Sequence, residues 1–145
     1  MPKCLPATSV STDSGRRAKE MEKYEVQNMK KYDLEERTMA FARRCRLLAY
    51  ALQRDTVSHE DVKQLIRSSG SVAANFIESR ESLSRKDCLH RLKICRKEAK
   101  ESHLWISLLQ IRKNPSLSIE LQKLFQESLE LTLIFGSIVT KLGNT

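Results

Sequence analysis

The sequence SRKDCLHRLKICRKEAKESHLWISLL (residues 84–109) is predicted to form the longest helix of the chain. Ser84 and Asp87 at its start match a capping box, in which a side-chain oxygen accepts from a free amide of the first turn. Its apolar and small residues recur at spacings of three and four: Cys88, Leu92, Cys95, Ala99, Ser102, Ile106 and Leu109. Nothing interrupts this pattern before Asn114-Pro115, where the helix is expected to end.

Three further helices are predicted from start signals and the same periodicity. Their expected limits are Asp33 to about Arg54, Ser58 to about Ser79, and Asn114 to Gly143. Their expected buried residues are Leu34, Phe41, Ala42, Cys45, Leu48, Ala49 and Leu52; Val62, Leu65, Ile66, Ser69, Val72, Ala73, Phe76 and Ile77; and Leu117, Leu121, Leu124, Phe125, Leu131, Ile134, Phe135, Ile138 and Leu142. Gly70 and the serines around it predict a close approach of a neighbouring backbone.

Four amphipathic helices with short connections predict an all-α fold, an antiparallel up-down four-helix bundle. Residues 29–145 are expected to form this single domain. Residues 1–28 bury little, and they are predicted to be a disordered or partly helical extension.

The positive charge of the chain is concentrated in one stretch. Lys and Arg total 26 and Asp and Glu 18, a net charge of +8, and residues 83–114 alone carry nine basic and three acidic side chains. At 100° per residue, Lys86, Lys93, Lys97 and Lys100 share the face opposite the apolar stripe, with Arg96 at its edge.

This face favours RNA or another polyanion, although a plain solvated face is the alternative. The predicted contacts are Lys86, Arg91, Lys93, Arg96, Lys97 and Lys100. No aromatic residue interleaves them, so base stacking is not expected there.

Residues 104–111, LWISLLQI, are apolar almost all round, whereas one bundle face needs only a stripe. A second copy of the chain is the expected cover, with Leu104, Trp105, Leu108 and Ile111 at the contact. The alternatives are a loop or tail folded over this surface, or an overpacked end of the core.

The cysteines indicate a structural role. Cys4, Cys45, Cys88 and Cys95 form no CxxC pair, and no export signal or membrane-spanning stretch accompanies them. Reduced, buried thiols in a soluble cytoplasmic protein are therefore predicted, with no metal and no cofactor.

One pattern raises catalysis as a weaker alternative. Arg85 and His90 resemble the Arg-x4-His element of the HEPN ribonucleases, in which the histidine acts on the ribose 2′-hydroxyl and the arginine holds the phosphate. Lys86 stands where that element usually has Asn or Asp next to the arginine. We predict no catalytic residue and a protein that is not an enzyme.

Two longer runs carry a family resemblance: KYDLEERTMAFARRCR (31–46) and QLIRSSGSVAANFIESRESLSRKDCLHRLKICRKEAKES (64–102). They resemble the bacterial four-helix-bundle proteins encoded within intervening sequences of large-subunit ribosomal RNA genes. That family also includes the accessory variability determinant proteins of diversity-generating retroelements.

The resemblance implies a homopentameric bundle without known enzymatic activity, and a family motif at Gly70, Asn75 and Glu78. Asn75 and Glu78 are expected to make a buried helix-to-loop hydrogen bond, the alternative being a functional pair. The leading prediction is a non-enzymatic oligomer that binds RNA or a ribonucleoprotein. The alternative is an accessory scaffold for a retroelement reverse transcriptase.

Overall fold

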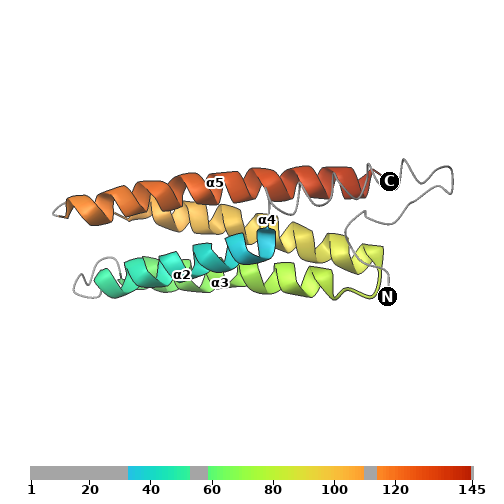
Figure 1. Ribbon diagram of the computed structural model, residues 1–145, viewed down its shortest axis with the longest axis horizontal. Coiled ribbons are helices and arrows are strands. Elements are labelled where there is room, and N and C mark those ends of the chain that lie inside the picture. The colour runs from blue at the N-terminus through green and yellow to red at the C-terminus, as the bar shows by residue number, and fades with distance from the viewer. Residues whose placement is uncertain (1–32, 53–58, 110–113, 145) are drawn as a thin grey trace.

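The computed structural model describes residues 33–52, 59–109 and 114–144. They form the helices α2 (Leu34–Ala51), α3 (His59–Arg80), α4 (Arg85–Leu108) and α5 (Pro115–Gly143). Consecutive helices run antiparallel; α2 packs against α3 and α5, and α4 packs against the same two helices (Figure 1). The predicted four-helix bundle is thus confirmed, whereas the predicted extension 1–28 lies outside the described residues.

Three of the predicted helix starts are capped by the expected side chains. Asp33 accepts from the amide of Glu36 at 3.1 Å, and Ser84 accepts from the amide of Asp87 at 3.1 Å. Asn114 accepts from two amides in the first turn of α5. These bonds satisfy amides that have no partner inside the helix, so local chemistry fixes where each helix begins. The fourth expected cap, Ser58, lies outside the described residues.

The core follows the predicted faces closely. Every residue of the predicted apolar stripe of α4 is buried. Two expected core residues are exposed instead, since Ile77 is 42% and Phe125 is 40% accessible. Both lie at the edge of their helix's apolar face, where residue spacing does not reveal how far the neighbouring helix reaches. Phe125 nevertheless packs its ring 4.2 Å from that of His103.

The far end of α4 differs from the prediction. The helix ends at Leu108, and Leu109 has an extended backbone (φ −73°, ψ 129°), so the expected continuation to Asn114 is wrong. The amide of Leu109 donates to the carbonyl of Ile106, which tightens the last turn. Leu109 is buried although it lies beyond the end of the helix. Gly143 belongs to α5 and has no positive φ.

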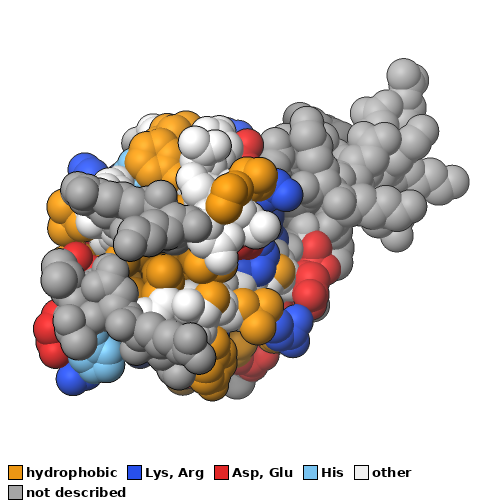
Figure 2. All heavy atoms as spheres, turned by 90° about the vertical axis from the view of Figure 1, so that its left-hand side faces the viewer, with side chains coloured by type: hydrophobic (Ala, Val, Ile, Leu, Met, Phe, Trp, Pro, Cys, Tyr) orange, Lys and Arg blue, Asp and Glu red, His pale blue; other side chains and the backbone are white. Residues whose placement is uncertain are grey.

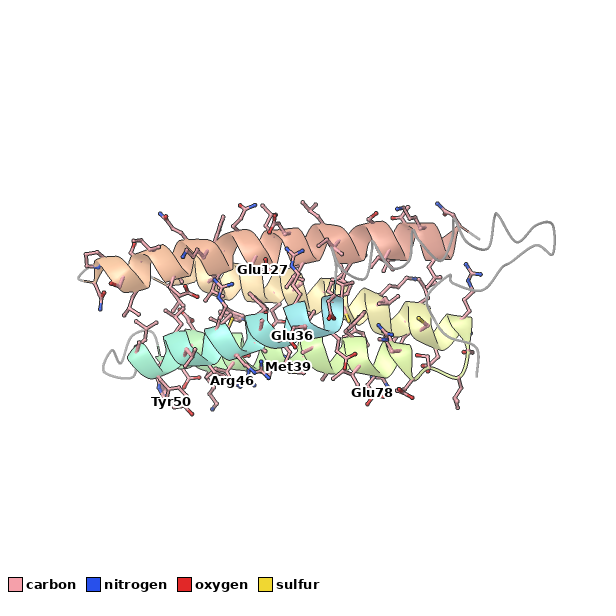
Figure 3. All side chains as sticks on the ribbon, in the orientation of Figure 1. Glu36, Met39, Arg46, Tyr50, Glu78 and Glu127 are labelled. Atoms are coloured by element: carbon pink, nitrogen blue, oxygen red, sulfur yellow. The ribbon has the colours of Figure 1, made fainter. Side chains whose placement is uncertain are left out.

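Ion pairs join α2 to α5, the first and last described helices. Arg37 lies 2.6 Å from Glu127 and 3.0 Å from Glu130. About two helical turns further on, Arg44 lies 2.8 Å from Glu120. Figure 3 shows Glu127 reaching from α5 towards α2. These partly buried pairs fix the register of α2 along α5.

Candidate nucleic-acid interface

Five basic residues on the outer side of α4 are exposed, and we call them the basic stripe: Lys86, Lys93, Arg96, Lys97 and Lys100. They lie on the side of α4 that faces away from the buried stripe. Among the described residues, none of these five side chains forms an ion pair with a carboxylate. The positive charge of the stripe therefore stays available to an external anion.

Two of the three acidic residues of α4, Glu98 and Glu101, pair with α3. Arg67 on α3 hydrogen-bonds Glu98, at 3.3 Å, and also Glu101. Glu98 is only 7% exposed. Burial tends to raise the pKa of Glu101, but hydrogen bonds from Arg67 and Trp105 outweigh it and lower the pKa. Both carboxylates thus pair with Arg67 of α3, and Glu101 also interacts electrostatically with Lys97 of its own helix.

Arg91 departs from the predicted contact set. Its side chain is partly buried, and its Nη1 donates to Asn75 Oδ1 on α3 at 3.2 Å. Asn75 Nδ2 in turn donates to the carbonyl of Ser71 at 2.8 Å. Arg91 therefore links α4 to α3 and lies apart from the basic stripe.

The expected helix-to-loop hydrogen bond of Asn75 and Glu78 is not made by their side chains. Asn75 bonds within α3 and to α4, and the Glu78 side chain is exposed. A bond of this kind exists nearby, because the Ser82 hydroxyl donates to the backbone carbonyl of Glu78 at 3.0 Å. No hydrogen bond joins the side chains of Asn75 and Glu78, which lie one turn apart on α3.

Gly70 has a different role from the one expected. A Cβ built at Gly70 would lie 2.9 Å from Nη2 of Arg46, so the guanidinium on α2 occupies the space that any other residue would fill. The close neighbour at Gly70 is thus a side chain and not a backbone. Buried serines do meet between helices, since Ser102 Oγ on α4 lies 2.8 Å from Ser68 Oγ on α3.

The predicted subunit contact is exposed in part. Leu104 and Leu108 are 49% and 50% accessible. Trp105 is partly buried against the core, and its Nε1 donates to Glu101 at 3.2 Å. Ile111 lies outside the described residues. Two leucines, rather than the tryptophan, carry the accessible apolar surface of α4.

An apolar row that the sequence analysis missed continues this surface onto α5. Phe125, Leu129 and Leu133 follow one another at four-residue spacing and are all exposed. The ring contact between His103 and Phe125 places the start of the row against α4. This row could have been found in the sequence, because α5 carries more apolar residues than one buried stripe requires.

Arg85 and His90, the ribonuclease alternative, are not brought together within one chain. Arg85 donates to the backbone carbonyl of Leu142 on α5 at 3.0 Å, and His90 is exposed. Residues five apart on a helix point about 140° away from each other. The arginine therefore anchors the end of α5, and the pair forms no joint site.

Cys45, Cys88 and Cys95 are buried, but their redox states differ. Cys45 and Cys95 are free thiols, and burial raises the pKa of each to about 12. Cys88 is disulfide-bonded, so the prediction of reduced thiols is wrong for this residue. In the described part of the chain, no three His, Cys, Asp or Glu side chains are placed to hold a metal ion. No described helix is long and apolar enough to span a membrane.

A second feature missed by the sequence analysis lies between α2 and α3. A cavity of about 210 Å³ is lined by Ala49, Leu52, His59, Val62, Lys63 and Ile66. Tyr50 and Arg46 project from α2 on the side away from α5 (Figure 3). Figure 2 looks onto the end of the bundle where α2 ends and α3 begins, and hydrophobic side chains reach the surface there beside basic ones.

Comparison with known proteins identifies a related structure. Neither protein-family profiles nor curated proteins gave a match. The crystal structure of a protein of unknown function from the S23 ribosomal protein family of Bacteroides thetaiotaomicron is similar, with 28% sequence identity and a TM-score of 0.61 over 72% of this chain and 96% of that one. The chain is thus a structural relative of the S23 ribosomal protein family, and the family resemblance of its sequence is confirmed.

Proposed function

We propose that this protein is a non-enzymatic homo-oligomer that binds RNA or a ribonucleoprotein through the basic stripe of α4. The observation that carries the proposal is the row of five exposed cations without a carboxylate partner among the described residues. Arg91 is left out of the contact set because its side chain is partly buried between α4 and α3, away from the basic stripe.

The shape of the stripe suits a nucleic-acid backbone. From Lys86 to Lys100 it extends for about 21 Å at 1.5 Å per residue, which spans several successive phosphates. Lysine ammonium groups contact phosphates as point charges and carry no sequence information. The related protein is assigned to a ribosomal protein family, which is consistent with a ribonucleoprotein partner.

The dependence of binding on salt tests this proposal. We expect the logarithm of the association constant for a blunt-ended RNA duplex to fall linearly with the logarithm of salt concentration. With four or five phosphate contacts, the slope should be about −4. Fluorescence anisotropy of labelled RNA at several salt concentrations measures it. A slope near zero would contradict phosphate binding by the stripe.

We further propose that the apolar surface of Leu104, Leu108 and the α5 row is the contact between subunits. The family resemblance implies that these subunits form a homopentamer. In the alternative function, a reverse transcriptase would dock on this same surface. Exposed apolar rows of this kind mark protein interfaces more often than free surface.

Sedimentation velocity separates these two uses of the apolar surface. We expect the wild-type protein to sediment well above the 16.7 kDa of one chain, and Leu104→Asp with Leu108→Asp to return it to one chain, because carboxylates are costly to bury. Leu47→Asp is the control, since Leu47 is also exposed, at 67%, but lies on α2. A wild-type protein of 16.7 kDa would contradict self-association and favour docking of another protein.

A further inference from the structure

The outer side of the α2 and α3 pair carries a group of residues that the basic stripe does not explain. We call it the α2/α3 site and define it as Arg46 and Tyr50 on α2 together with the cavity that Lys63 lines. Tyr50 directly follows Ala49, which lines the cavity, and Lys63 lines it from α3. Figure 3 shows Tyr50 and Arg46 on the same side of α2.

The cavity itself is mainly apolar. Its lining includes the side chains of Ala49, Leu52, Val62 and Ile66, and its volume is about 210 Å³. Pockets of this composition hold flat or branched apolar groups, with a few polar side chains at the edge to fix their orientation. Here Lys63 and His59 supply the polar groups.

The two cations of the site are available to a ligand. Neither Arg46 nor Lys63 forms an ion pair with a described carboxylate. Arg46 is held in place because its Nη1 donates to the carbonyl of Ala42 at 3.1 Å and because Gly70 leaves room for its guanidinium. A preorganised arginine loses less conformational freedom when it binds an anion.

Tyr50 adds an exposed aromatic ring. It is 69% accessible, although a tyrosine is large enough to bury most of its ring on a bundle surface. Aromatic rings beside arginines are the usual means by which proteins bind single-stranded nucleic acid, because each base offers a face for stacking. The basic stripe of α4 has no such ring.

We propose that the α2/α3 site binds an unpaired nucleotide of single-stranded RNA. The base stacks on Tyr50 and covers the apolar cavity, while Arg46 and Lys63 contact the phosphates on either side. Paired bases are stacked inside a duplex and do not reach the ring, so the site selects single strands. The inference rests on the proposed RNA binding, and it assigns the kind of RNA.

This site is separate from the basic stripe. Both α2 and α4 pack against α3 and α5, so α2 and α4 are the diagonal pair of the bundle and their outer faces point in opposite directions. A short single strand of about eight nucleotides covers one face only. Variants of the two surfaces can therefore be compared on two probes.

The experiment uses the full chain with two labelled RNAs, a single strand of about eight nucleotides and a blunt-ended duplex. We expect Tyr50→Ala to weaken single-strand binding about tenfold and Tyr50→Phe to retain it, because phenylalanine keeps the stacking ring. Leu47→Ala is the matched control, since Leu47 is 67% exposed on the same helix, and it should change neither affinity. Duplex binding should be unchanged in all three variants.

The cations give an independent readout. Arg46→Gln and Lys63→Gln should each reduce the salt slope of single-strand binding by about 0.7 and leave the duplex slope unchanged. Circular dichroism of each variant checks that the helices remain intact.

The outcomes distinguish the site from the proposed function. Equal single-strand binding by wild type and Tyr50→Ala would overturn the α2/α3 site and leave duplex binding by α4 standing; the cavity would then suit an apolar side chain of a protein partner. If duplex binding did not depend on the α4 lysines while single-strand binding still depended on Tyr50, the proposed function of the basic stripe would be overturned and the α2/α3 site would stand. A wild-type protein that binds neither RNA would overturn both.

Discussion

Replacing Lys93, Lys97 and Lys100 together with glutamate is expected to weaken duplex RNA binding on the order of 100-fold. The substitution removes three adjacent cations and puts three anions in their place, so the stripe repels the phosphates that it attracted. These three side chains are exposed and make no ion pair with described residues, and their loss should leave the bundle intact. Anisotropy titrations at fixed salt measure the effect.

A control with the same change in net charge separates the stripe from the overall charge of the protein. Arg43→Glu, Lys123→Glu and Lys141→Glu alter three exposed cations on α2 and α5 and lower the net charge equally. This control should weaken duplex binding only a few-fold. Equal losses in the two triple variants would mean that net charge, and not the arrangement on α4, attracts RNA.

Phe135→Ala is expected to cost about 3–5 kcal/mol of unfolding free energy. Its ring is fully buried in α5 and lies 6.0 Å from the ring of Phe76 on α3, in the middle of the core. Domains of this size have about 5–15 kcal/mol in total, so the variant should be close to unfolding at 37 °C. Urea unfolding at a fixed protein concentration measures the change.

Phe125→Ala provides the comparison for Phe135→Ala. Phe125 is 40% exposed and touches His103, so its removal leaves no closed cavity. We expect less than half the cost of Phe135→Ala. Equal costs would contradict this difference between a fully buried and a partly exposed ring within one chain.

Helix starts were predictable because their cause is local. Asp33, Ser84 and Asn114 each accept from amides two or three residues away, and such spacing is visible in the sequence. The end of α4 was not predictable from a breaker residue. Leu109 leaves the helix while remaining buried, which depends on how the other helices close the core at that end.

The basic stripe was visible in the sequence for a similar reason, since helical spacing alone places Lys86, Lys93, Lys97 and Lys100 on one side. Contacts between helices were not visible. Arg67 pairs with Glu98 on another helix, and the guanidinium of Arg46 lies against Gly70 on another helix. The periodicity of one helix carries no information about which residues of its partner it will contact. The α2/α3 site was missed because it combines two helices in this way.

The ion pairs of α2 with α5 set an order of events during protein synthesis. Glu127 follows Arg37 by 90 residues, so α2 leaves the ribosome long before its acidic partners exist. A nascent chain can pair α2 with α3 and α3 with α4, but the ring of helices cannot close until α5 has emerged. A chain truncated before Glu120 would lack most of α5, so α2 could pack only against α3.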